Sequence, residues 1–121
     1  MTSAPAAIYD IRLFRGYDFK TEITLENEAD DGTITPLDLT GGDIAASAWD
    51  FERENKYADF LITYINKPAG LFNISLTDDQ TLNFPDELYY DVRFQNSVGD
   101  KTPYIRGKIT TLQGYERWRI K

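Results

Sequence analysis

The 121-residue sequence contains neither cysteine nor histidine. Without thiols or imidazoles, the chain has no zinc-finger ligand set, no thiol nucleophile and no histidine-based catalytic triad. It also lacks the side chain that titrates most readily near neutral pH, so acid–base catalysis would require a strongly shifted carboxyl, lysine or tyrosine pKa. We therefore predict that the protein is not an enzyme and uses no cofactor and no metal ion.

Long apolar runs are also missing, since none approaches the roughly 18 residues of a membrane span. The first residues lack the basic and apolar regions of a signal peptide. Positive charge is scarce, because 13 Lys and Arg stand against 20 Asp and Glu, for a formal net charge of −7. Such a field repels phosphate backbones and anionic lipid. The sequence thus predicts no nucleic-acid partner, no membrane partner and synthesis in the cytoplasm.

The dominant pattern is alternation of apolar and polar residues with period two, which is typical of β-strands. In residues 19–26, Phe19, Ile23 and Leu25 share one face and the charged residues share the other. Strands of this kind, separated by turns rich in Gly, Asp and Pro, indicate an all-β, antiparallel, immunoglobulin-like sandwich of about seven or eight strands. The clearest predicted strands cover residues 8–14, 19–26, 44–49, 60–65, 72–77, 88–95 and 104–112.

One segment departs from this pattern. Thr77 is followed three residues later by Gln80, which is the spacing of a helix capping box, and Pro85 ends the segment. We therefore predict one short helical turn at residues 77–82. Residues 1–7 predict a flexible N-terminal arm, and residues 8–121 a single β-sandwich domain.

Two acidic features have simpler explanations than a catalytic or metal site. Residues 26–32 lack the spacing and the closing Glu of a calcium loop, so we interpret them as a solvated hairpin turn. Asp78 and Asp79 are adjacent at a predicted helix start, where acids favour the helix dipole. Asn73 begins a glycosylation sequon, but it lies in the middle of a predicted strand, so we treat the match as chance.

Aromatic residues are abundant, with 8 Tyr, 7 Phe and 2 Trp, more than one inner face can hold. Those on outer faces predict either a hydrophobic protein interface or a platform for stacking sugars. The C-terminal segment 115–121 interleaves aromatic, basic and aliphatic residues. It is either a last edge strand, with Trp118 and Ile120 facing the core, or a partner-binding segment, since Trp and Arg are frequent in interface hot spots. The candidate interface residues are Tyr115, Arg117, Trp118 and Arg119.

Three stretches together resemble a family of small β-sandwich proteins and domains in tailed-phage virions, including the N-terminal type of upper baseplate proteins. The stretches are LDLTGG before an Ala- and Trp-containing strand, AGLFNISLTDDQTLNF, and LYYDVRFQNSVGDKTPYIRGKITTLQG. The resemblance covers roughly residues 16–114. It implies a structural role in a tail, baseplate, neck or head decoration, whereas the C-terminal segment has no counterpart in it.

We therefore expect a non-enzymatic structural protein of a tailed-phage virion, made in the host cytoplasm and assembled into the particle. Its expected partners are other virion proteins, together with further copies of itself in a symmetric homo-oligomer. Pairing of the N-terminal arm with an exposed sheet edge of a neighbour is one expected contact. The alternative is a module that binds carbohydrate or a host surface through exposed aromatics.

Deleting residues 115–121 should leave a folded domain that no longer assembles with its virion neighbours. The measurements are circular dichroism, thermal melting and an assembly or pull-down assay on the truncated protein. Loss of the fold would assign the segment to the core, and unchanged assembly would make it dispensable. Either result contradicts the hypothesis that the segment binds a partner.

Overall fold

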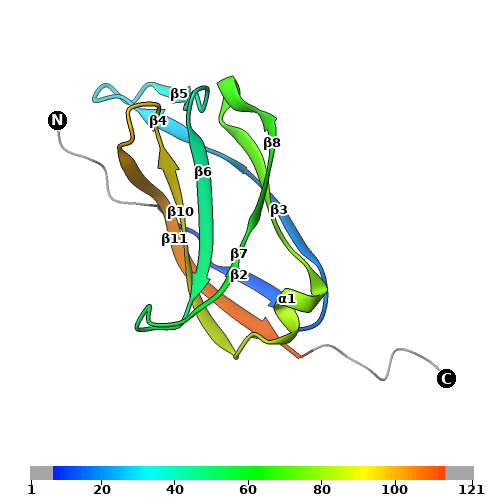
Figure 1. The fold of residues 1–121 in the computed structure, drawn as a ribbon. Coiled ribbons are helices and arrows are strands. Elements are labelled where there is room, and N and C mark those ends of the chain that lie inside the picture. Colours follow the sequence, from blue (N-terminus) through cyan, green and yellow to red (C-terminus); the bar gives the residue numbers. More distant parts are fainter. Residues whose placement is uncertain (1–6, 114–121) are drawn as a thin grey trace.

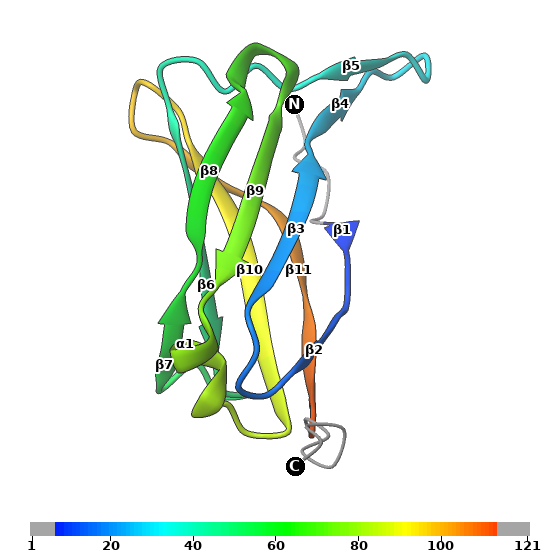
Figure 2. The ribbon, with the colours of Figure 1, turned by 90° about the vertical axis from the view of Figure 1, so that its right-hand side faces the viewer.

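The computed structural model describes residues 7–113, which form an all-β, immunoglobulin-like sandwich of two sheets (Figure 1). A separate hairpin projects from one end of the sandwich, and a short helix lies near the other end (Figure 2). The first sheet contains β1 (Ala7–Ile8), β2 (Ile11–Phe14), β11 (Lys101–Leu112), β10 (Glu87–Gln95), β6 (Asp43–Trp49) and β7 (Lys56–Asp59). The second contains β3 (Phe19–Thr24), β9 (Leu71–Leu76) and β8 (Leu61–Asn66), and the hairpin contains β4 (Glu26–Glu28) and β5 (Ile34–Pro36).

The core lies between the two sheets and follows from the alternation in the sequence. Along β9, Phe72, Ile74 and Leu76 are buried while the residues between them are partly exposed. The residues predicted to face the interior are buried in the structure, apart from Phe19, which is partly buried against the core. These buried residues are Ile23, Leu25, Ile44, Phe72, Ile74, Leu76, Val92 and Ile109.

The chain crosses from the first sheet to the second at Phe60, between β7 and β8. Phe60 is buried, its N–H donates to the Ala46 carbonyl on β6, and its ring packs 5.9 Å from that of Tyr90. The predicted strand at 60–65 therefore begins one residue later, as β8. Similarly, the predicted strand at 19–26 is divided at Leu25, whose N–H bonds to the Gly70 carbonyl.

The N-terminal strands pair in parallel with β11, whereas the other strand pairs are antiparallel. The single strand predicted at 8–14 is interrupted at Tyr9 and Asp10, which separate β1 from β2. Ala7, assigned to the arm from the sequence, begins β1, and residues 1–6 lie outside the described range. Short strands such as β1 explain why the structure contains more strands than the seven or eight expected.

The predicted helical turn is confirmed as α1 (Asp78–Leu82), and η1 (Lys67–Ala69) is a further single turn of 3₁₀ helix. The Thr77 hydroxyl accepts from the Gln80 N–H, and the Gln80 side chain accepts from the Thr77 N–H, which completes the capping box. Buried Thr81 ties α1 to the sandwich, because its hydroxyl accepts from the Gly16 N–H and donates to the Tyr17 carbonyl.

Truncating Ile74 to Ala should lower the free energy of unfolding by about 2–5 kcal/mol, because it opens a cavity at a fully buried site. Lys20→Ala is the matched control, since Lys20 lies on the adjacent strand β3 with its side chain exposed. Its effect should stay within about 0.5 kcal/mol. Denaturant melts in which the two variants are equally stable would contradict this strand register.

Candidate functional site

The residues proposed from the sequence as an interface, Tyr115, Arg117, Trp118 and Arg119, lie outside the described residues. Their role therefore stays a prediction. Within residues 7–113, two other surfaces combine exposed apolar side chains with polar groups that are available to a partner. One is a hollow on the outer face of the first sheet, and the other is the free edge of β8.

The acidic features have the structural roles expected of them. Of the acidic stretch 26–32 that we interpreted as a turn, residues 26–28 instead form β4. Residues 29–32 form the exposed turn of the β4–β5 hairpin, where the Asp31 carboxylate accepts from the Thr33 N–H. Hydrogen bonds from the Thr33 side chain and then from its backbone lower the pKa of Asp31. Asp78 and Asp79 occupy the first turn of α1. The described residues contain no cluster of three or more potential metal ligands, and no helix among them is long and apolar enough to cross a membrane.

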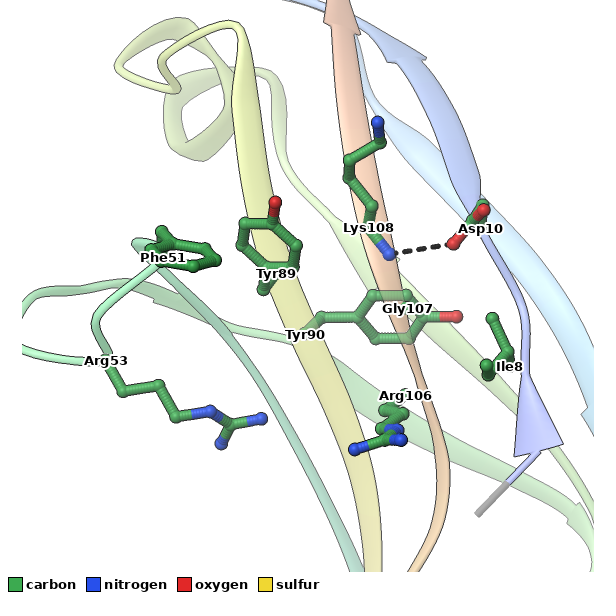
Figure 3. Close-up of a pocket in the computed structure, with 9 residues that line it drawn as sticks. All are labelled: Ile8, Asp10, Phe51, Arg53, Tyr89, Tyr90, Arg106, Gly107 and Lys108. Atoms are coloured by element: carbon green, nitrogen blue, oxygen red, sulfur yellow. Dashed lines mark hydrogen bonds between the residues drawn. The ribbon is translucent and has the colours of Figure 1, made fainter. Parts of the chain in front are cut away.

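The outer hollow lies where β10, β11, β1 and the loop after β6 meet (Figure 3). Its volume is about 350 Å³, within the range of pockets that hold small ligands. Its lining includes two arginines and three aromatic residues. The lining residues are Ile8, Asp10, Phe51, Arg53, Tyr89, Tyr90, Arg106, Gly107 and Lys108.

The loop at 50–55 supplies Phe51 and Arg53 to the hollow. The Asp50 carboxylate accepts from the Glu54 N–H and the Asn55 side-chain amide, and the Asp50 carbonyl accepts from the Arg53 N–H. Desolvation raises the pKa of Asp50, but these hydrogen bonds outweigh it and hold the pKa below its ordinary value. Arg53 has φ 59°, in the left-handed region that non-glycine residues rarely occupy. The loop thus has a defined shape, maintained at some cost in backbone strain.

Asp91 on β10 lies between the two arginines of the hollow. Its Oδ2 accepts from Arg53 Nη1 at 3.0 Å, and Arg106 is its neighbour across the β10–β11 ladder. Asp91 Oδ1 is buried without a hydrogen-bond partner among the described residues, at 3.8 Å from Arg93 Nη1. The Asp91 side chain is only 9% exposed, whereas that of Arg53 is 50% exposed. A largely buried carboxylate therefore anchors a guanidinium that is still open to solvent.

An exposed aromatic pair forms the second part of the lining. The Phe51 and Tyr89 rings meet edge to face, with centroids 5.5 Å apart (Figure 3). Phe51 is 78% exposed, so one side of its ring is available to a ligand. The excess of aromatics in the sequence indicated an outer-face site of this kind. Tyr90, by contrast, is a core residue, and Trp49 and Tyr104 are only partly exposed.

One wall of the hollow is formed where the chain is interrupted between β1 and β2. The Tyr90 hydroxyl donates to the Tyr9 carbonyl, and burial raises the pKa of Tyr90 well above its ordinary value, so it remains a donor. Gly107 is required here because a Cβ would collide with the Tyr9 carbonyl. The Asp10 carboxylate accepts from the Lys108 N–H at 2.9 Å, replacing the interrupted ladder (Figure 3).

The free edge of β8 is the second candidate surface. Its sequence, LITYIN, contains no charged residue and no proline, two of the features that normally protect exposed edges, although its register with β9 shifts between Tyr64 and Asn66. Leu61 is 67% exposed and Ile65 is 48% exposed. The other edge of this sheet, β3, carries Lys20 and Glu22. Among the described residues, β8 is thus the longest edge strand without a charge.

No protein-family model and no curated protein matches this chain. Among solved structures, it is similar to AggA, the major subunit of aggregative adherence fimbriae type I from Escherichia coli. The TM-score is 0.33 and the sequence identity 13%, over 84% of this chain and 90% of that one. A likeness at this level says nothing about what this chain does.

Replacing Asp50 with Ala should loosen the loop that carries Phe51, because the loop loses two side-chain hydrogen bonds. Nuclear Overhauser contacts between the Phe51 and Tyr89 rings should weaken. In the native protein the same contacts should persist at pH 5 and weaken only once the pH is below the ordinary pKa of an aspartic acid, since the lowered pKa of Asp50 keeps these bonds until its carboxylate is protonated.

Glu52→Ala is the control, because it removes the same charge from the same exposed loop and Glu52 makes no hydrogen bond within the described residues. Ring contacts that survive Asp50→Ala as well as they survive Glu52→Ala would show that the loop does not depend on Asp50.

Proposed function

We propose that this protein is a non-enzymatic structural protein of a tailed-phage virion, which assembles into a symmetric homo-oligomer and docks on other virion proteins. The motifs that carry the family resemblance support this proposal. The LDLTGG turn precedes β6, the SLT motif joins β9 to α1, and the YDV motif lies in β10. Each therefore has a structural position in the sandwich.

The observation that carries the assembly role is the uncharged edge of β8. Unpaired N–H and C=O groups along an edge are a template for another strand. On a chain with a net charge of −7, most surfaces repel a second copy. The β8 edge does not, because it has no charge and presents two exposed aliphatic side chains.

The occupant that fits this edge best is β8 of a second copy. Antiparallel pairing about a two-fold axis at Thr63 sets Thr63 of each copy opposite itself. It also brings Leu61 of each copy near Ile65 of the other, where the register of β8 shifts. Apolar and Thr–Thr cross-strand pairs each stabilise a sheet by roughly 0.2–1 kcal/mol. Such an interface is self-complementary, as two-fold symmetry requires. It would extend the three-stranded sheet across both copies.

Carbohydrate binding is a second candidate function, favoured by one observation. The Phe51 ring is 78% exposed beside Tyr89 at the rim of the outer hollow. An aromatic face held in place by a short loop suits the apolar face of a sugar. This surface belongs to the first sheet, so it does not compete with the β8 edge for a partner.

Replacing Leu61 with Lys should leave the fold intact and weaken self-association about tenfold or more, because two lysines enter each symmetric interface. Sedimentation equilibrium or native mass spectrometry measures the dissociation constant. Val98→Lys is the matched control, since Val98 is 79% exposed in the loop between β10 and β11. An oligomer that tolerates Leu61→Lys as well as Val98→Lys would exclude the β8 edge as its interface.

A further inference from the structure

Two guanidinium groups of the outer hollow have N–H donors that are available to a ligand. Arg106 is exposed, and its side chain makes no ion pair or hydrogen bond with any residue that the structure describes. Arg53 uses one N–H on Asp91 and is half exposed. Each guanidinium carries five donors in a planar fork that suits a carboxylate. The Lys108 ammonium lies 3.6 Å from Glu87 and points away from both arginines (Figure 3).

An exposed apolar ring lines the same hollow as these donors. Phe51 and Arg53 are two residues apart in the same loop, so their Cα atoms lie within about 7 Å of each other. The loop is fixed by Asp50, and Arg53 adopts its strained backbone conformation within it. Backbone strain of this kind clusters at binding sites, where surrounding structure maintains it. The strain, the exposed ring and the open guanidinium groups therefore coincide in one place.

We propose that the outer hollow binds a sugar that carries a carboxylate on its ring, as uronic and sialic acids do. The carboxylate lies between Arg53 and Arg106, and the apolar face of the pyranose ring packs on Phe51 beside Tyr89. This inference rests on the second candidate function above and specifies its ligand class. It is independent of the β8 edge.

The geometry favours an acidic sugar over an acidic peptide. In a uronic acid the carboxylate is attached directly to the ring, so one small ligand offers both a charge for the guanidinium groups and an apolar face for Phe51, which line the same hollow. An Asp or Glu side chain offers the carboxylate without an adjoining ring face, and it would leave the exposed Phe51 ring uncovered. The hollow, at about 350 Å³, has the size of a site for one or two sugar units.

The net charge of −7 does not prevent this binding. Exposed charges farther than about 8–10 Å from the ligand are largely screened at physiological ionic strength. Within that distance, Asp91 offsets Arg53, Glu87 pairs with Lys108, and the loop itself carries Asp50, Glu52 and Glu54. Binding therefore depends on direct hydrogen bonds from Arg53 and Arg106 and not on a net positive local charge. Charge-assisted hydrogen bonds to an arginine contribute about 1.5–3 kcal/mol, which corresponds to roughly tenfold or more in affinity.

A matched pair of ligands tests the proposal. Methyl β-glucuronide and methyl β-glucoside share one ring and differ at a single carboxylate. Titrated into the full-length protein and followed by ¹H–¹⁵N NMR, the glucuronide should shift the resonances of Phe51, Arg53, Tyr89 and Arg106. Its affinity should exceed that of the glucoside by about tenfold or more and fall as salt is added.

Two variants test the carboxylate-binding and the ring-stacking parts of the site separately. Arg106→Gln should weaken glucuronide binding about tenfold and leave glucoside binding unchanged, whereas Phe51→Ala should weaken both. Lys101→Gln is the charge control, because Lys101 is an exposed cation on the same strand outside the hollow. It should bind the glucuronide as the native protein does.

Several outcomes overturn the inference. One is equal binding of glucuronide and glucoside, which leaves the carbohydrate function standing without a carboxylate preference. Another is equal weakening by Lys101→Gln and Arg106→Gln, which indicates diffuse charge attraction. A glutamate-rich peptide that shifts the same resonances when the glucuronide does not would assign the hollow to a protein partner. No binding by glucuronide, galacturonide or sialoside glycosides removes the second candidate function as well.

Discussion

The hydrogen bond from the Tyr90 hydroxyl to the Tyr9 carbonyl joins the core of the sandwich to its outer surface. The Tyr90 ring is fully buried against Phe60, at the point where the chain changes sheets. Its hydroxyl holds the Tyr9 carbonyl close to Gly107, where a side chain would not fit. A hydrogen bond of this kind contributes about 0.5–1.5 kcal/mol to stability. This interaction adds to the β1–β11 ladder and helps to form the wall of the outer hollow.

The two candidate surfaces use this framework in different ways. The β8 edge offers backbone groups and exposed aliphatic side chains, so the partner proposed for it is another strand. The outer hollow offers guanidinium groups and an aromatic face, so the partner proposed for it is a small anionic ligand. They belong to different sheets, and therefore strand pairing at β8 leaves the hollow accessible. A virion subunit with both surfaces would assemble through one and contact a glycan through the other.

The core could be predicted from the sequence because period-two alternation assigns each residue to a face. Ile74 and Val92 are buried where the alternation places them, and Thr77 and Gln80 make the predicted capping box. The parallel pairing of β1 and β2 could not be predicted, since alternation identifies a strand but not its neighbour. The division of predicted strands at Tyr9 and Leu25 arises from contacts with residues far along the chain.

Only some residues of the outer hollow could be predicted from the sequence. The surplus of aromatics indicated an outer-face site, and Phe51 and Tyr89 form one. Arg53 and Arg106 were missed, because they are 53 positions apart and meet only through the β10–β11 ladder and the loop at 50–55. The uncharged LITYIN run was readable as a strand, but its position at a sheet edge depends on tertiary structure.

Hydrogen–deuterium exchange on the assembled and the monomeric protein tests the central claim, assembly through β8, most directly. Edge amides that gain a strand partner exchange more slowly. The account predicts slower exchange in the peptide covering residues 61–66 on assembly, with little change in the edge strand β3. Assembly that leaves residues 61–66 as exchangeable as in the monomer, while another surface becomes protected, would contradict it.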